Sequence, residues 1–123
     1  MGKMVNSYKK GDNDIRPWGT WEVLDCGNNF CVKKIVVTPQ GCLSLQSHNY
    51  RSEHWIVISG KAIVTIDDKE ICKVAGENVF IPVKTKHRIK NNGKQNLEFI
   101  EIQYGEILDE NDIIRYEDIY GRN

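Results

Sequence analysis

The sequence lacks long apolar runs, an excess of charge of either sign and clear helix signals. No apolar stretch approaches the roughly 20 residues that are needed to cross a bilayer. The first residues, MGKMVNSYKKGDND, are polar and lack the apolar core of a secretory signal. The 17 basic and 17 acidic residues cancel, and no basic run resembles a phosphate-binding stripe. We therefore expect a cytoplasmic globular protein whose partners include neither a membrane nor a nucleic acid.

The cysteines are few and do not form zinc-binding pairs. No CxxC motif occurs, which argues against a zinc ribbon. In a reducing compartment cysteines are usually inert, buried thiols. Cys26 and Cys31 flank the turn-like GNN and are expected to face each other across a hairpin. A disulfide there is compatible with the sequence, but free thiols are favoured for all four residues, Cys26, Cys31, Cys42 and Cys72.

Short runs of β-branched and aromatic residues take the place of helical patterns. Such runs are typical of strands, and turn-forming segments such as CGNN, TPQG and NNGK separate them. Many short strands at regular spacing predict an all-β sandwich or barrel, and 123 residues suffice for one domain. In IVTIDDKEICKV we expect a hairpin with Asp67 and Asp68 at its tip. Only DENDIIRYEDIYG, near the end, favours a short C-terminal helical turn.

Two of the three histidines lie in one short segment, LSLQSHNYRSEHW. Alternate side chains of a strand share one face, so Gln46 and His48 are expected to point the same way. Glu53 opens the next strand, and His87 begins a later one. Two imidazole nitrogens and two oxygens suit one divalent metal ion, with positions left for water or substrate. Each of these residues alone is more often an ordinary polar side chain, so the prediction depends on their joint spacing.

This spacing resembles the two sequence motifs of cupins. The first motif, QSHNYRSEHWIVISG, begins at Gln46, and the second, GENVFIPVKTKHRIKN, begins at Gly76. Cupins normally ligate a metal with His, His, Glu and His, and here Gln46 takes the place of the first His. Lys84 replaces the usual Gly of the second motif. The resemblance implies a cupin fold, a double-stranded β-helix or jelly-roll barrel.

A narrower resemblance runs from about Arg16 to Arg122. RPWGTWEVLD, the two motifs and IEIQYGEILDENDIIRYEDIYGR are similar to the C-terminal cupin domain of bacterial type II mannose-6-phosphate isomerases. In that family the domain usually follows a mannose-1-phosphate guanylyltransferase domain. The resemblance implies an isomerase that interconverts mannose 6-phosphate and fructose 6-phosphate, within GDP-mannose and polysaccharide biosynthesis. We expect a free-standing cupin domain over residues 16–123, a flexible extension over residues 1–15, a homodimer and a separate guanylyltransferase.

The resemblance also implies the metal ligands. The isomerases use a Gln-x-His, Glu and His set, which matches Gln46, His48, Glu53 and His87. Zinc is the expected ion, with cobalt, manganese, iron and nickel as alternatives. The family commonly carries a second His two places after the first, and in this chain that residue is Tyr50.

Proton transfer and phosphate binding need further residues. An aldose–ketose isomerase moves a proton between C1 and C2, which requires a base and a positive charge near the developing oxyanion. His54 and Arg115 are the catalytic candidates, although a regular strand would point His54 away from the face of Glu53. The candidates for binding the phosphate are three cations near the predicted ligands, Arg51, Lys86 and Arg88.

Three other functions remain open from the sequence. A non-catalytic cupin that binds a sugar phosphate or nucleotide sugar, or one that acts on another sugar phosphate, would keep the metal set. A cupin oxygenase would hold iron, and the Gln in place of the first His argues mildly against it. A purely structural β-domain would leave the four predicted ligands apart in space.

Overall fold

The computed structural model describes residues 4–121 and contains thirteen strands. The strands are β1 (Val5–Asn6), β2 (Asn13–Arg16), β3 (Gly19–Cys26), β4 (Phe30–Val37), β5 (Leu45–Ser47), β6 (Arg51–Ser59), β7 (Lys61–Ile66), β8 (Lys69–Val74), β9 (Asn78–Ile81), β10 (His87–Lys90), β11 (Leu97–Gly105), β12 (Ile107–Leu108) and β13 (Ile114–Glu117). No helix occurs within this described range, and so none there could cross a membrane. The all-β prediction is confirmed.

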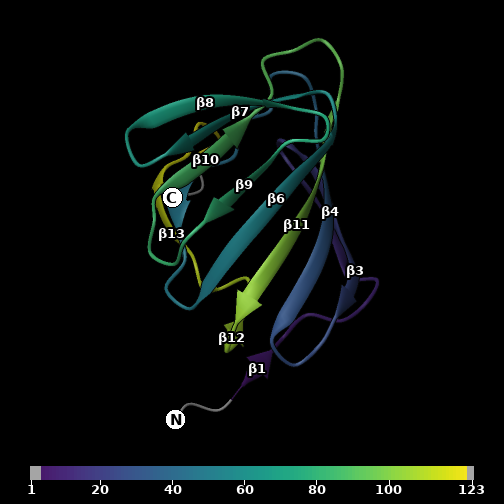
Figure 1. The fold of residues 1–123 in the computed structure, drawn as a ribbon, viewed down its shortest axis with the longest axis vertical. Helices are drawn as coiled ribbons and strands as arrows, with labels where there is room; N and C mark the ends of the chain where they lie inside the picture. The colour runs from purple at the N-terminus through teal and green to yellow at the C-terminus, as the bar shows by residue number, and fades with distance from the viewer. Residues whose placement is uncertain (1–3, 122–123) are drawn as a thin grey trace.

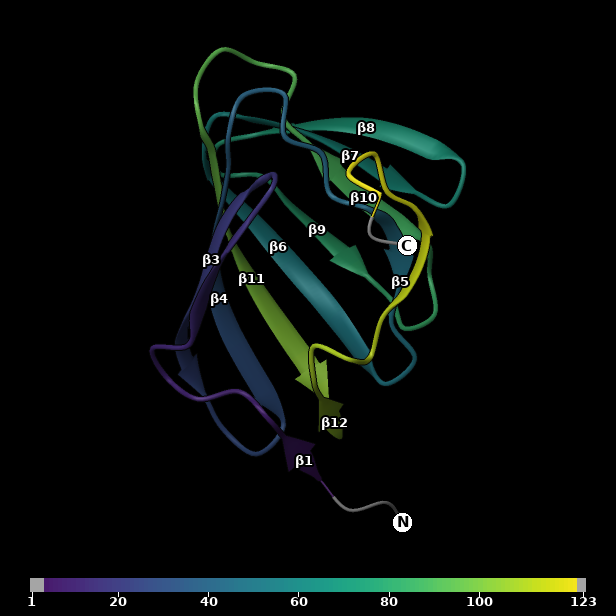
Figure 2. The ribbon, with the colours of Figure 1, turned by 180° about the vertical axis from the view of Figure 1, so that it is seen from behind.

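The strands form two main sheets that face each other. One has the order β13-β5-β10-β7-β8, the other has the order β2-β3-β4-β11-β6-β9, and β1 pairs with β12 in a small third sheet. Figures 1 and 2 show the two main sheets as separate layers, with β7, β8 and β10 in one and β3, β4, β6 and β11 in the other. A pocket between the sheets is therefore lined from both sides.

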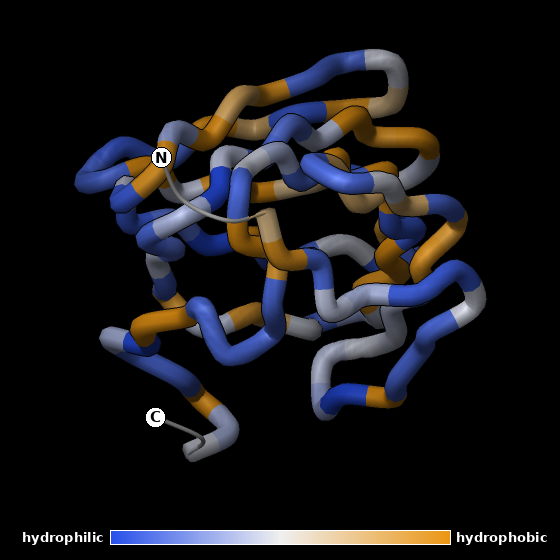
Figure 3. Tube along the Cα trace, turned by 90° about the horizontal axis from the view of Figure 1, so that it is seen from below, coloured by the Kyte–Doolittle hydropathy of each residue, from blue (hydrophilic) through white to orange (hydrophobic). Residues whose placement is uncertain are grey.

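Alternation along the strands determines which side chains enter the core. β4 and β11 each switch regularly between buried and less buried positions. Figure 3 shows the same feature as short apolar and polar segments that alternate along the trace. Trp55 and Phe99 of one sheet and Val64 and Ile89 of the other are among the buried apolar residues, each 3% exposed or less. Two-residue periodicity thus builds one shared core between the sheets.

Two turns have the backbone that the sequence favours. β7 and β8 pair as a hairpin that ends at Ile66 and Lys69, which leaves Asp67 and Asp68 at the tip as predicted. Gly60 joins β6 to β7 with a φ of 85°, and a Cβ atom there would lie 2.6 Å from the Asn96 carbonyl oxygen. Only glycine meets both demands without strain.

The prediction of a C-terminal helical turn is wrong. Ile114–Glu117 forms strand β13, in which Ile114 pairs with Ser47 and Arg115 with Gln46. The Arg88 guanidinium also binds the Glu117 carboxylate at 2.9 Å. Pairing with the open edge of β5 satisfies backbone groups that one isolated helical turn would leave unpaired, so tertiary structure overrides the local pattern.

The predicted flexible extension also differs from the structure. Val5–Asn6 pairs in parallel with β12, and Asn13–Arg16 pairs antiparallel with β3. Tyr8, between them, is only 6% exposed. Residues 4–15 are therefore part of the folded domain, because their backbone and Tyr8 find partners that are distant in sequence. Residues 1–3 and 122–123 lie outside the described residues.

Candidate metal centre and the pocket around it

His48, Glu53 and His87 meet inside the pocket. His48 directly follows β5, Glu53 lies in β6, and His87 opens β10. Their candidate ligand atoms all lie within 4.8 Å of one another, and the side chains are 4%, 2% and 2% exposed. The Glu53 carboxylate lies 3.2 Å from His48 Nε2 and 3.9 Å from His87 Nε2. This spacing suits three ligands that share a single metal ion, each at roughly 2 Å from it.

Backbone carbonyls orient both imidazole rings. His48 Nδ1 donates to the Asp112 carbonyl oxygen at 2.7 Å, and His87 Nδ1 donates to the Thr85 carbonyl oxygen at 2.9 Å. A carbonyl only accepts, so each Nδ1 carries a proton and each Nε2 faces Glu53, where the neutral form of the ring offers a lone pair to a metal ion. Metal-binding histidines are commonly held in this way, and the donor set therefore fits a divalent ion.

Arg51 shares the triad's polar groups. Its Nε donates to Glu53 at 2.8 Å, and its Nη2 lies 3.3 Å from His48 Nε2. A third bond joins Nη1 to the Asp109 carbonyl oxygen at 3.2 Å. The His48 Nε2 lone pair cannot serve Arg51 and a metal ion together, so metal binding requires the Arg51–His48 contact to break.

Burial and neighbouring charges shift the pKa values at the triad. Burial raises the pKa of Glu53, but its interactions with His48 and Arg51 outweigh burial and hold this pKa well below its usual range. Burial lowers the pKa of His87, which favours the neutral imidazole that binds metals. For Arg51, burial lowers the pKa, but Glu53 more than compensates and the pKa is raised. Glu53 is therefore ionised and available as a ligand.

Gln46 lines the same pocket as the triad. Its backbone pairs with His87 on one side and with Arg115 on the other. Gln46 as a fourth ligand remains a prediction. The backbone at Lys84, where cupins usually carry Gly, has a φ of 60°, and its amide donates to the His48 carbonyl oxygen at 2.7 Å. The backbone that contacts the His48 carbonyl thus has a left-handed conformation at this position, and Lys84 adopts it in place of glycine.

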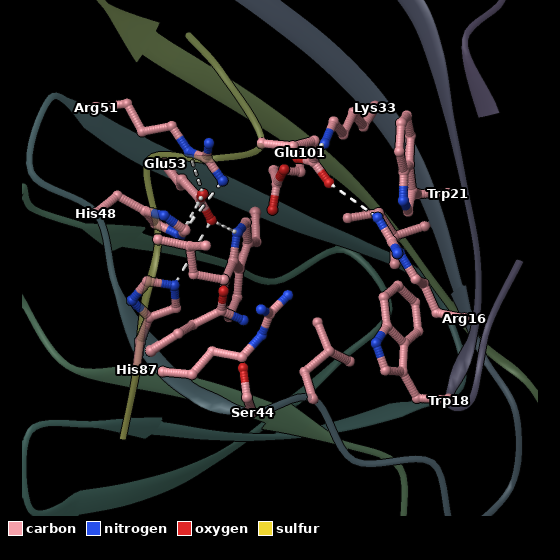
Figure 4. A pocket seen from close by; sticks show the side chains of 17 residues that line it. Arg16, Trp18, Trp21, Lys33, Ser44, His48, Arg51, Glu53, His87 and Glu101 are labelled. Carbon is pink, nitrogen blue, oxygen red and sulfur yellow. Dashed lines mark hydrogen bonds and ion pairs between the residues drawn. The ribbon is translucent and has the colours of Figure 1, made fainter. Parts of the chain in front are cut away.

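A second polar cluster lines the pocket across from the triad, as Figure 4 shows for Lys33 and Arg16. Lys33 is 3% exposed, and its Nζ lies 3.0 Å from the Glu110 carboxylate and 3.2 Å from the Tyr8 hydroxyl. The ammonium group also sits over the rings of Tyr8 and Trp21, 4.3 and 4.2 Å from their centroids. A buried cation of this kind is stable only with such partners.

Glu110 completes this cluster. It accepts hydrogen bonds from Tyr8 and Lys33, and its other carboxylate oxygen lies 3.5 Å from Arg16. Burial raises the pKa of Glu110, but Lys33 and the hydrogen bonds from Tyr8 and Lys33 lower it to about 2. The side chain as a whole is 40% exposed, so only its carboxylate end takes part in the buried network.

Glu101 lies between the two groups. It is 6% exposed, lines the pocket and accepts a hydrogen bond from the Gln103 amide at 2.8 Å. Burial, and then the nearby Glu53 carboxylate, raise the pKa of Glu101 to about 7. Figure 4 shows its side chain between Glu53 and Lys33. The pocket therefore holds a carboxylate that belongs to neither the triad nor the lysine cluster.

The structure separates the other predicted site residues. Arg51 and Arg115 line the pocket, whereas Lys86 and Arg88 do not. Lys86 lies over the Tyr116 ring, 4.4 Å from its centroid, and Arg88 binds the Leu43 carbonyl oxygen and Glu117. Both flank His87, and alternation along the chain directs neighbours of an inward residue outward. Their predicted contact with the phosphate is not supported by this placement.

His54 is also outside the pocket, which corrects its prediction as a catalytic residue. The side chain is exposed, its Nε2 lies 3.1 Å from the Asn78 side-chain oxygen, and its ring meets Phe80 edge to face. β6 has no bulge at this point that would turn His54 inward, because Glu53, His54 and Trp55 pair in register with β9. Regular pleating therefore places His54 and Glu53 on opposite faces.

Sequence reasoning missed Lys33, Glu101 and Glu110. Lys33 stands in FCVKKIVV at the same parity as the buried Cys31 and Ile35, and Glu101 stands in LEFIEIQY at the parity of Phe99. A charged residue at an inward position of a strand is the signal that would have identified the first two. Glu110 follows the last long strand and carries no such signal.

The cysteines are free thiols in the structure, as favoured. Cys31 and Cys42 are buried, Cys26 is half-buried and Cys72 is exposed. Cys26 and Cys31 do pair across the β3–β4 hairpin. Burial raises the pKa of the Cys31 thiol to about 12, so Cys31 is inert at neutral pH.

Comparison with known proteins finds relatives over most of the chain. Residues 4–118 match the family model described as "Mannose-6-phosphate isomerase C-terminal". The chain is 50% identical over 108 residues to the alginate biosynthesis protein AlgA of Pseudomonas syringae pv. tomato, which covers 88% of this chain and 22% of that protein. It is 44% identical over 108 residues to a mannose-1-phosphate guanylyltransferase of Salmonella montevideo, with 88% and 23% covered. The chain spans about a fifth of the length of these relatives.

A solved structure shows the same fold. The Schizosaccharomyces pombe Cnp3 cupin domain matches with a TM-score of 0.68 at 14% identity, over 70% of this chain and 64% of that chain. At this identity the likeness concerns the fold alone. The cupin architecture predicted from the two motifs is confirmed.

Proposed function

Because the chain belongs to the family of C-terminal mannose-6-phosphate isomerase domains, we propose that it is a metal-dependent isomerase that interconverts mannose 6-phosphate and fructose 6-phosphate. The observation that carries the proposal is the buried triad of His48, Glu53 and His87, in which both Nε2 atoms face one carboxylate. A structural β-domain has no need for three convergent ligands in its interior, since a buried carboxylate is costly and here requires a dedicated cation, Arg51.

The metal would be held by His48, Glu53 and His87, with Gln46 as the proposed fourth ligand. When bound, it supplies positive charge that polarises the sugar oxygens at C1 and C2. The two nitrogen and two oxygen donors suit zinc, which we propose as the native ion. Arg51 lies against the triad and adds a second positive charge on the same side of the pocket.

Proton transfer between C1 and C2 is assigned to Glu101. Three carboxylates line the pocket, of which Glu53 belongs to the triad and Glu110 is paired with Lys33. Glu101 is neither a member of the triad nor paired with Lys33, and it lies between the two ends of the pocket (Figure 4). A carboxylate in this position can take a proton from one carbon of the sugar and return it to the neighbouring carbon.

An activity assay with metal control tests the proposal. We expect conversion of mannose 6-phosphate to fructose 6-phosphate that is lost after chelation and restored by zinc or cobalt. Glu101→Gln should keep the metal but lower kcat by about 10²–10⁴-fold, the usual contribution of general acid–base catalysis. Stoichiometric metal without turnover on any hexose phosphate would instead assign the chain to sugar-phosphate binding without catalysis.

The assembly is also proposed. Ile15 on β2 and Phe80 on β9 are 82% and 55% exposed, and these strands form the two edges of the six-stranded sheet. Open edges with apolar residues favour pairing with another copy, and we propose a homodimer. The measurement is the molar mass in solution by light scattering, and a monomer at all concentrations would refute the dimer.

A further inference from the structure

Three donors converge on one carboxylate in the lysine cluster. Lys33, Arg16 and Tyr8 all contact Glu110, and Lys33 and Arg16 line the end of the pocket opposite the triad (Figure 4). Lys33 comes from β4, Arg16 ends β2 and Tyr8 precedes β2. An ammonium, a hydroxyl and a guanidinium around one anion are the groups that proteins use to bind phosphate oxygens.

Glu110 is carried by a short strap, residues 109–112, that connects β12 to β13 and places Glu110 in the pocket lining. The strap is attached to the triad side, where the Asp109 carbonyl accepts from Arg51 and the Asp112 carbonyl accepts from His48. The Asp112 carboxylate accepts from the backbone amides of Asn49 and Tyr50. The Glu110 carboxylate thus reaches the far end of the pocket from an anchored backbone, and its side chain, which is 40% exposed, borders solvent.

The charges in the pocket match an incoming dianion. Four cations line it, Arg16, Lys33, Arg51 and Arg115, together with three acids, Glu53, Glu101 and Glu110. Removing Glu110 from this count changes a formal sum of +1 to +2, which is opposite in sign and similar in size to the charge of about −1.5 to −2 that a phosphate monoester carries near neutral pH. The Arg115 Nε is buried and has no hydrogen-bond partner among the described residues, so the pocket also holds an unused donor.

We propose that Lys33 and Arg16, which line the pocket, form the subsite for the substrate's phosphate group with support from the Tyr8 hydroxyl beside Lys33, and that the Glu110 carboxylate occupies this subsite until phosphate displaces it. The inference rests on the proposed function, since it places the phosphate of the sugar opposite the metal triad. It replaces the predicted phosphate contacts of Lys86 and Arg88, which lie outside the pocket. Glu110 then acts as an internal competitor for the substrate.

Binding of inorganic phosphate to the chelated protein tests the subsite without any need for turnover. Lys33→Gln should weaken phosphate binding by about tenfold or more, the usual effect of removing one partner of a buried charge-assisted hydrogen bond. Glu110→Gln should tighten it, because a neutral amide competes less well for the three donors. Lys34→Gln and Glu106→Gln are the matched controls, since Lys34 is the outward neighbour on β4 and Glu106 is exposed in the same segment as Glu110.

The phosphate subsite and the proposed function can each be overturned by a separate result. Unchanged phosphate affinity in a folded Lys33→Gln, or no gain in Glu110→Gln, would overturn the subsite. If Lys33→Gln fails to fold, Lys33→Arg and Arg16→Gln take its place, with retained binding expected for the first and weaker binding for the second. Phosphate binding that follows the prediction without isomerisation of mannose 6-phosphate would retain the subsite and refute the proposed function. Normal turnover with a KM that neither Lys33→Gln nor Glu110→Gln changes would support the proposed function and overturn the subsite.

Discussion

The two ends of the pocket are built in different ways. At the triad end, the His48 and His87 side chains are aimed by hydrogen bonds to backbone carbonyls, so the positions of the ligands follow from the path of the strands. At the lysine end, Lys33, Tyr8 and Glu110 hold one another through side-chain contacts alone. Backbone-anchored ligands are preorganised for one fixed task, whereas a network of side chains can exchange one anion for another.

The largest expected effect comes from breaking the triad end. His87→Ala should abolish stoichiometric metal binding and isomerase activity together, because the site loses one of its two imidazole ligands and no longer binds a divalent ion tightly. His54→Ala is the matched control, since His54 sits one residue from Glu53 on the outer face of the same strand. We expect its metal content and kcat to equal those of the parent protein. Metal loss in His54→Ala would contradict the placement of the site.

A smaller effect is expected at the lysine end, in the acid stability of the protein. The pKa of Glu110 is lowered to about 2 in the folded chain, from about 4.5 when unfolded. A lowered folded pKa contributes stability that is present above pH 4.5 and is lost as the pH falls toward 2. Between pH 4.5 and pH 2, Glu110→Gln should lose less free energy of unfolding than the parent protein. The difference should be no more than about 2 kcal/mol, because the Glu110 side chain is 40% exposed and solvent screens the pair.

The measurement is the free energy of unfolding by urea, taken at intervals between pH 4.5 and pH 2. Glu106→Gln should follow the parent curve, because Glu106 is exposed and stands in the same segment. If Glu110→Gln and the parent lose stability in parallel, the Lys33–Glu110 pair does not contribute as the structure indicates.

The triad end was predictable from the sequence, and the lysine end was not. Gln46, His48 and Glu53 lie within eight residues of one another, so their shared face follows from strand alternation and one loop. Tyr8 and Glu110 are separated by 102 positions, and no local pattern announces that they meet. Lys33 did have a local signal, because it occupies an inward-facing position in the alternation of β4. Lysines are usually exposed, so this signal alone does not predict a buried side chain.

The fold shows the same division between local and distant information. Strand periodicity and the Asp67–Asp68 turn predicted the all-β class and the β7–β8 hairpin correctly. The ends of the chain were predicted less well, because β1 and β13 exist only through pairing with β12 and β5. Short polar segments of this kind carry too little pattern to indicate a strand before their partner is known.

The most direct test of the central claim is a metal titration of the chelated protein, with the three histidine side chains followed by NMR. The account predicts one zinc ion per chain, with the His48 and His87 rings shifting together at their Nε2 atoms while His54 stays unchanged. The absence of zinc binding, or a zinc ion that shifts the signals of His54 and leaves those of His48 or His87 unchanged, would contradict the account.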